Sequence, residues 1–85
     1  MSIHFKDGII LDLIRLCNDA KLRKRLDRLL TELERDPFGG FAKAEPLKGD
    51  RAGQWSKRID EKHRLVYKVE NGIVTVIECG EHYDD

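Results

Sequence analysis

Three kinds of side chain in this sequence suit metal-free cleavage of RNA. Glu45 supplies a carboxylate, His82 supplies an imidazole followed by the phenol of Tyr83, and residues 43–68 are rich in Lys and Arg. A base that removes the 2′-hydroxyl proton of ribose lets that oxygen attack phosphorus, and an acid protonates the leaving 5′-oxygen. A guanidinium stabilises the charge on phosphate and binds two of its oxygens. Each residue alone is an ordinary surface residue, and only the set indicates this chemistry.

The charges are unevenly distributed along the chain. The 85 residues include 16 Lys and Arg and 16 Asp and Glu, so the formal net charge is zero. Residues 43–68 nevertheless carry eight basic side chains against four acidic ones, whereas residues 69–85 carry five acidic side chains and no Lys or Arg. Binding follows the local field rather than the total. We therefore expect phosphate contacts from the central segment and weak unaided binding to nucleic acid.

Length and composition limit the class of protein. Residues 1–85 suit a single domain, with no apolar run long enough for a membrane helix and no signal-peptide pattern. Two cysteines are too few for a disulfide scaffold, so we expect a soluble cytoplasmic protein. Cys79, Glu81 and His82 match no common zinc spacing, and no glycine-rich phosphate loop occurs. We expect neither a metal nor a cofactor.

Two helices are expected to position these groups from the first half of the chain. Apolar residues recur at helical spacing in two stretches, which are Ile10, Leu13, Ile14 and Cys17, and then Leu22, Leu26, Leu29, Leu30 and Leu33. Asp7 is the expected N-cap of the first helix, and Asn18-Asp19 should connect the two in a helical hairpin. Asp36 should end the second helix because it precedes Pro37.

The second half predicts a sheet. Residues 38–53 are expected to form a loop, and a loop of that length in a compact domain is usually functional or disordered. Three β-rich runs follow, at residues 54–59, 64–69 and 73–79. Asn71-Gly72 predicts a type I′ hairpin, and residues 3–5 are an edge-strand candidate. The order indicates an α+β domain whose N-terminal helical hairpin packs on one face of an antiparallel sheet of three to four strands.

The hairpin turn predicts a register for the last two strands. On one face, the first set of pairs is Val69 with Val74, Tyr67 with Val76 and Leu65 with Glu78. On the other face, the second set is Lys68 with Thr75, Val66 with Ile77 and Arg64 with Cys79. The first set is more apolar and should face the helices, together with Trp55 and Ile59. The outer face should then carry Ser56, Arg58, Arg64 and Lys68. Its cations form a candidate anion site.

Several motifs in this half resemble those of a known family. The segments are Pro37-Phe38-Gly39, Glu45-Pro46-Leu47-Lys48, Trp55-Ser56-Lys57-Arg58-Ile59, His63-Arg64-Leu65-Val66-Tyr67 and His82-Tyr83. In order, spacing and overall length they resemble the YoeB/Txe toxins of the RelE superfamily, from bacterial type II toxin–antitoxin pairs. The chain departs from the family pattern in residues 3–17, where Phe5 is the one aromatic side chain, and at Ala44, where a proline is common.

The resemblance implies a RelE-like, microbial-ribonuclease-like fold and an endoribonuclease that cuts mRNA in the ribosomal A site. It assigns Glu45 as general base, His82 as general acid and Arg64 as the group that stabilises the transition state. It also assigns substrate binding to Lys48, Arg58 and Tyr83. The implied partners are mRNA on the ribosome, a YefM/Phd-like antitoxin and, in a homodimer, a second copy of the chain.

Two other functions fit the same residues. The weakly basic balance and the atypical N-terminal third also suit a non-cleaving module of the same fold that binds antitoxin or ribosome. A ribonuclease that acts without ribosomes is the third reading, and the small basic surface disfavours it because naked RNA should bind weakly. A cell-free translation assay separates the three by whether the message is cut, and whether cutting needs ribosomes.

Overall fold

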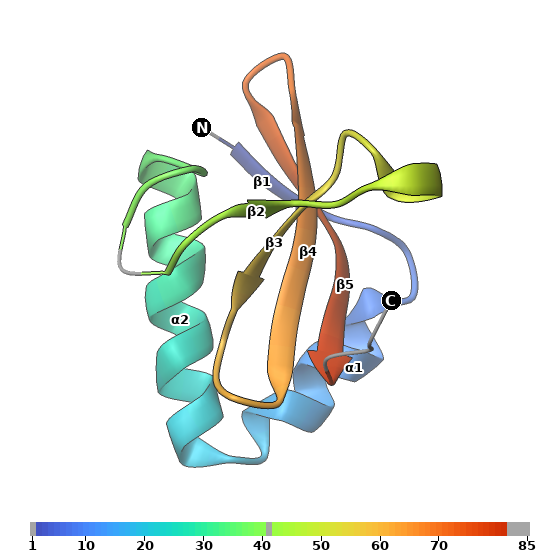
Figure 1. The fold of residues 1–85 in the computed structure, drawn as a ribbon. Coiled ribbons are helices and arrows are strands. Elements are labelled where there is room, and N and C mark those ends of the chain that lie inside the picture. The colour runs from blue at the N-terminus through green and yellow to red at the C-terminus, as the bar shows by residue number, and fades with distance from the viewer. Residues whose placement is uncertain (1, 41, 82–85) are drawn as a thin grey trace.

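A five-stranded mixed sheet with two helices forms the fold (Figure 1). The computed structural model describes residues 2–40 and 42–81, without the side chain of Glu81. The helical elements are α1 (Ile9–Cys17), α2 (Ala20–Arg35) and the 3₁₀ turn η1 (Gly49–Arg51). The strands are β1 (Ser2–Phe5), β2 (Glu45–Pro46), β3 (Trp55–Arg58), β4 (His63–Glu70) and β5 (Ile73–Glu81), in the spatial order β1-β5-β4-β3-β2. Within the described residues, no helix is long and apolar enough to cross a membrane.

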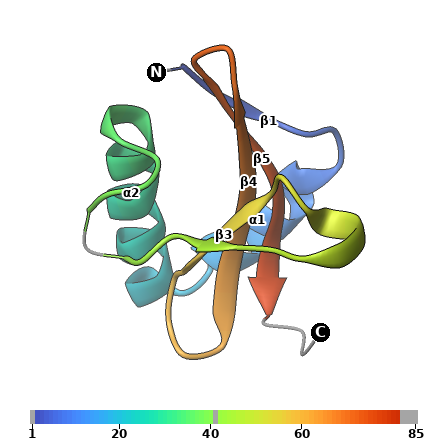
Figure 2. The same ribbon diagram turned by 45° about the horizontal axis from the view of Figure 1, so that its top comes forward.

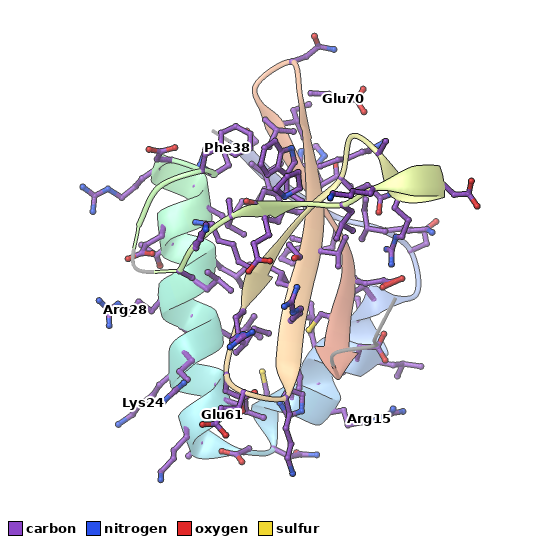
Figure 3. The ribbon with its side chains drawn as sticks, viewed as in Figure 1. Arg15, Lys24, Arg28, Phe38, Glu61 and Glu70 are labelled. Atoms are coloured by element: carbon purple, nitrogen blue, oxygen red, sulfur yellow. The ribbon has the colours of Figure 1, made fainter. Side chains whose placement is uncertain are left out.

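The second helix follows its sequence pattern. Its buried residues are Leu22, Leu26, Leu29 and Leu33. Asp19 caps the helix by accepting hydrogen bonds from the backbone N–H groups of Lys21 and Leu22, at 2.9 and 3.2 Å. Figure 3 shows Lys24 and Arg28 extending from the side of α2 away from the sheet. The prediction for α2 is therefore confirmed.

The first helix presents a different face from the one predicted. Ile9 and Leu16 are buried, whereas Ile10 and Ile14 are 54 % and 56 % exposed. The helix begins after Gly8 rather than at an Asp7 cap, because the chain turns there with a φ of 89° that glycine adopts without strain. The helix's own apolar residues occupy much of the circumference of these nine residues. Periodicity alone therefore did not identify which side of the helix is buried.

The last hairpin keeps its predicted register only in part. Asn71 and Gly72 both have positive φ, as a type I′ turn requires, and the pairs from the turn to Tyr67–Val76 are as predicted. An irregularity then leaves Ile77 as an extra residue in β5, so that Val66 pairs with Glu78. Beyond it the predicted partners are wrong: Leu65 pairs with Cys79, and Arg64 with Gly80. A β-bulge therefore separates the turn from the far end of the hairpin.

Two further strands distinguish the sheet from the predicted one. β1 lies beside β5 and runs parallel to it, so the sheet is mixed rather than antiparallel. Residues 38–53 include η1 and the short strand β2, which pairs with β3 through Glu45–Ser56 and Pro46–Trp55. In Figures 1 and 2 this segment passes in front of β4, while α1 lies behind β5. The α+β architecture with two N-terminal helices is confirmed.

The predicted inner face of the sheet is confirmed as the core. The leucines of α2 belong to one buried cluster with the sheet residues Ile59, Leu65, Tyr67, Val74, Val76 and Cys79, and Trp55 packs against it. Burial of such side chains stabilises the fold by roughly 1.5–3 kcal/mol each. The opposite face of β3 and β4, which carries Ser56, Arg58 and Arg64, is called the outer face below.

Candidate active site

Arg64 is a partly buried cation of the outer face. Its Nη1 atom donates a hydrogen bond to the Oγ atom of Ser56 at 3.1 Å. Its Nε atom is buried, and within the part of the chain that the structure describes no atom accepts a hydrogen bond from it. A buried donor without an acceptor costs about 1–3 kcal/mol. The Nε–H group is therefore suited to an acceptor on a ligand, such as a phosphate oxygen.

A second guanidinium lies beside the first. Arg58 of β3 and Arg64 of β4 are directly opposite each other in the antiparallel ladder, so both side chains project from the outer face. Like charges in opposed positions destabilise a sheet, whereas opposite charges contribute roughly 0.2–1 kcal/mol in its favour. An anion bound between the two arginines would remove this repulsion.

Glu45 reaches the same face from the edge of the sheet. It is exposed on β2 and pairs directly with Ser56, which is the residue that holds Arg64. Directly opposed residues have Cβ atoms roughly 4.5–5.5 Å apart and side chains on one face. A carboxylate, a hydroxyl and a guanidinium therefore follow one another across β2, β3 and β4.

Two neighbouring cavities divide these residues. One, of about 580 Å³, is lined by Ser56 and Arg64 and continues to Asp12 and Arg15 of α1. The other, of about 440 Å³, is lined by Glu45 and Arg58, with Lys43 and Arg25. Glu45 and Ser56 are paired in the sheet but line different cavities. The first has the size of a small-molecule site.

Of the remaining predicted site residues, the structure places Lys48, and it lies away from this point. Lys48 is exposed at the start of η1 and belongs to the lining of neither cavity. His82 and Tyr83 lie outside the described residues. Gly80, which precedes His82 by two positions in the sequence, pairs with Arg64.

Lys57, one of the eight basic residues of segment 43–68, does not lie on the outer face. Its side chain faces the helices and is fully buried, and its Nζ atom donates a hydrogen bond to the carbonyl oxygen of Gly39. Burial lowers the pKa of Lys57, and the carboxylates of Glu32 and Asp36 oppose this effect. This lysine is therefore a structural cation and contributes nothing to the outer face.

The turn between β3 and β4 sets the position of Arg64. The Oδ1 atom of Asp60 accepts hydrogen bonds from the backbone N–H groups of Lys62 and His63, at 2.8 and 2.7 Å, and lies 2.9 Å from Nδ1 of His63. Burial alone would raise the pKa of Asp60, but these hydrogen bonds lower it below its usual value. The residue directly before Arg64 is thus tied to the turn.

Sequence reasoning missed an ion pair on the outer face. Nη2 of Arg51 lies 3.0 Å from Oε1 of Glu78, and Nε of Arg51 donates to Oε1 of Gln54 at 3.0 Å. Arg51 and Glu78 line the same cavity as Arg64. Only the bulge at Ile77 puts Glu78 on this face, and nothing in the sequence pattern indicated it. Among the described residues, no three His, Cys, Asp or Glu side chains are grouped as metal ligands.

Comparisons with known proteins agree on one family. The model of the YoeB-like toxins of bacterial type II toxin–antitoxin systems matches residues 11–83. A relative named Toxin YoeB, from Streptomyces coelicolor, is 48 % identical over 66 residues, which cover 78 % of this chain and 79 % of that protein.

Solved structures show the same likeness over nearly the whole chain. The YoeB/ParE toxin from Agrobacterium tumefaciens is 37 % identical, with a TM-score of 0.87 over 98 % of this chain and 100 % of that one. The toxin in a YoeB–YefM complex from Staphylococcus aureus is 32 % identical, with a TM-score of 0.84, and that of a YoeB dimer from the same organism is 33 % identical, with a TM-score of 0.83. Each comparison covers 98 % of both chains.

Proposed function

The chain belongs to the family of YoeB-like toxins of bacterial type II toxin–antitoxin systems, and from this premise we propose that it is an endoribonuclease that cuts mRNA in the ribosomal A site. The opposed pair of arginines on the outer face is the observation that carries the proposal. Arg58 and Arg64 repel each other in the free protein, and the buried Nε–H group of Arg64 has no acceptor among the described residues. A phosphodiester removes the repulsion and accepts that hydrogen bond.

The proposed reaction is an internal attack by ribose on phosphate. Glu45 removes the proton from the 2′-hydroxyl, and the 2′-oxygen forms a bond to phosphorus. The bond from phosphorus to the 5′-oxygen breaks, and His82 gives that oxygen a proton. Arg64 stabilises the added negative charge on the phosphate oxygens. The products are a 2′,3′-cyclic phosphate and a 5′-hydroxyl, and no metal or cofactor takes part.

The proposed substrate-binding residues surround this set. Arg58 binds the phosphate beside Arg64, Lys48 provides a second and more peripheral contact, and Tyr83 orients the nucleotide. Ser56 positions the Arg64 guanidinium through its 3.1 Å hydrogen bond. Because Ser56 also pairs with Glu45, it sets the position of the proposed base relative to the guanidinium that is proposed to bind phosphate.

The need for a ribosome follows from how few cations are free to bind RNA. Of the eight basic residues between positions 43 and 68, Lys57 is buried. Arg51 is paired with Glu78, and Lys68 lies 3.3 Å from Glu70. Affinity for naked RNA rises with the number of phosphates neutralised, so this surface binds it weakly. A ribosome that presents the message supplies the missing affinity.

The proposed partners and location follow the same family. The related S. aureus toxin is described both in complex with YefM and as a dimer. We propose that a YefM-like antitoxin neutralises this chain, that the chain also forms a homodimer, and that it acts in the cytoplasm, where ribosomes translate.

Cleavage of ribosome-bound mRNA by the purified chain tests the proposal. Arg64→Gln and His82→Ala should each slow cleavage at least about 100-fold, because each loses a group that acts in the transition state. Arg23→Gln, which removes the same charge from an exposed position on α2, should cut like the parent. Circular dichroism should show all three variants folded.

Each other outcome identifies a different failure. Parent-like cleavage by both Arg64→Gln and His82→Ala contradicts the assigned roles. Arrested translation with intact message indicates the non-cleaving module instead. Efficient cutting of bare RNA at low protein concentration contradicts the dependence on ribosomes.

A further inference from the structure

The bulge in β5 places a carboxylate beside the proposed phosphate site. A regular ladder from the Asn71-Gly72 turn would pair Glu78 with Leu65 and aim it at the core. With Ile77 as the extra residue, Glu78 pairs with Val66 and projects from the outer face, while Cys79 turns inward and is buried. Bulges are common next to active sites, where they redirect a side chain. Here the redirected side chain is an acid that lies in the same cavity as Arg64.

The carboxylate is held by a guanidinium. Arg51 contacts Oε1 of Glu78 through Nη2 at 3.0 Å and Oε1 of Gln54 through Nε at 3.0 Å. The side chains of Arg51 and Glu78 remain 33 % and 47 % exposed, so both are accessible from solvent. The pair is close to neutral and offers N–H donors next to a carboxylate acceptor. It therefore favours an uncharged ligand with donors and acceptors on one edge over a second phosphate, which Glu78 would repel.

The rest of the cavity suits the flat face of a base. Leu47 and Val66 are among the residues that line it, and both are at least half-buried. Glu78 and Gly80 are two residues apart on β5, as Val66 and Arg64 are on β4. Two residues of strand span roughly 7 Å, which is the scale that separates a phosphate from the base of one nucleotide. The Arg58–Arg64 row and the Arg51–Glu78 pair are thus spaced like the two ends of a nucleotide.

We propose that Arg51 and Glu78 form a subsite that recognises guanine in the RNA substrate. This inference rests on the proposed function and adds a base preference to it. Guanine presents two adjacent donors, N1–H and N2–H, to Glu78, and its O6 oxygen accepts a hydrogen bond from Arg51. The Watson–Crick edges of adenine, cytosine and uracil each have one donor position beside acceptors, which the carboxylate repels. Single-stranded RNA is read on these edges when the bases are unstacked.

The test measures cleavage of ribosome-bound messages that differ in a single base of the A-site codon, with each position varied in turn. Glu78→Gln removes the negative acceptor, and Arg51→Gln removes the donor to O6. Glu70→Gln is the matched control, because it breaks the 3.3 Å contact with Lys68. Figure 3 shows Glu70 at the tip of the β4–β5 hairpin, at the opposite end of the sheet from Glu61 in the β3–β4 turn. The readout is the ratio of cleavage rates between messages, which a general loss of stability would not change.

The parent should cut messages with guanine at one codon position at least about fivefold faster than those with any other base there. Glu78→Gln and Arg51→Gln should each bring that ratio close to one, and Glu70→Gln should retain it. Equal cleavage of all four messages by the parent overturns the subsite and leaves the proposed function standing. A guanine preference that survives in both Glu78→Gln and Arg51→Gln has the same meaning. If Glu78→Gln does not fold, Arg51→Gln decides alone. A parent that cuts no message refutes both the function and the subsite.

Discussion

Replacing Lys57 by alanine should cost about 2–4 kcal/mol of folding free energy, although this lysine belongs to the basic segment 43–68. The side chain is fully buried on the inner face of β3 and donates its Nζ–H to the carbonyl oxygen of Gly39. Alanine lacks three buried methylene groups, worth roughly 0.8 kcal/mol each, and the charge-assisted hydrogen bond, worth about 1.5–3 kcal/mol. Alanine also avoids about 1.5–2 kcal/mol of side-chain entropy, which reduces the net loss.

Methionine separates the two contributions to this loss. Lys57→Met keeps an unbranched apolar side chain in the same space and no longer has to desolvate an ammonium group. It loses the hydrogen bond to Gly39, so its cost should be about 1 kcal/mol, less than that of alanine. Lys62→Ala removes an exposed lysine from the β3–β4 turn and should change stability by less than about 0.5 kcal/mol.

Urea unfolding followed by the fluorescence of Trp55 measures these differences. Trp55 is the one tryptophan of the chain, and its ring packs edge-on against Phe38 with centroids 4.8 Å apart, so unfolding should change its emission. If Lys57→Ala unfolds within 0.5 kcal/mol of the parent, Lys57 is not a buried structural cation.

The lowered pKa of Lys57 also predicts in which direction the stability of the protein changes with pH. Between its folded pKa and the value of 10.5 for a free lysine, the unfolded chain binds more protons than the folded one. The stability of the parent relative to Lys57→Met should therefore rise with pH in that interval. A falling difference would contradict the assigned burial.

Two other predictions concern the core and the helix start. Burial raises the pKa of Cys79 to about 12, with Asp12 and Cys17 adding to the rise, so above pH 9 only the unfolded chain should lose this proton. The free energy of unfolding should then fall with rising pH by up to about 1.4 kcal/mol per pH unit, as measured by urea unfolding. This pH-dependent loss should be absent in Cys79→Ala. An unchanged slope in that variant would mean that Cys79 is not the group responsible. Asp19→Ala should lose about 1 kcal/mol and lower the melting temperature by about 4–8 °C, because the cap of α2 is gone. Asp27→Ala, in the middle of the same helix, should have a much smaller effect, and equal shifts for the two would mean that the cap does not matter.

The sequence predicted those parts of the fold that local patterns determine. The leucines of α2 recur at one spacing over sixteen residues, so a single face could be chosen. Asn71-Gly72 encodes its own backbone conformation, and the register near the turn follows from it. Burial of apolar residues then set the inner face of β3 and β4, which also brought Ser56, Arg58 and Arg64 together on the outer face.

The missing parts depend on contacts between distant residues. β2 has two residues and no pattern of its own, and it exists because Glu45 pairs with Ser56. The bulge at Ile77 shifts every later residue of β5 by one position, which changed the predicted partners of Leu65 and Arg64. The Arg51–Glu78 contact needs both the bulge and η1, so counting along the sequence could not find it.

The parallel pairing of β1 with β5 has a consequence for biosynthesis. Ser2 pairs with Ile73 and Phe5 with Val76, so the first of the described strands is partnered by the last. Such non-local pairing slows folding, and it is impossible until β5 has been synthesised and has left the ribosomal exit tunnel. A nascent chain can form its helices early, but the sheet that carries Arg64 stays incomplete until β5 has left the exit tunnel. The surface that is proposed to cut RNA is therefore completed only after β5 has been made.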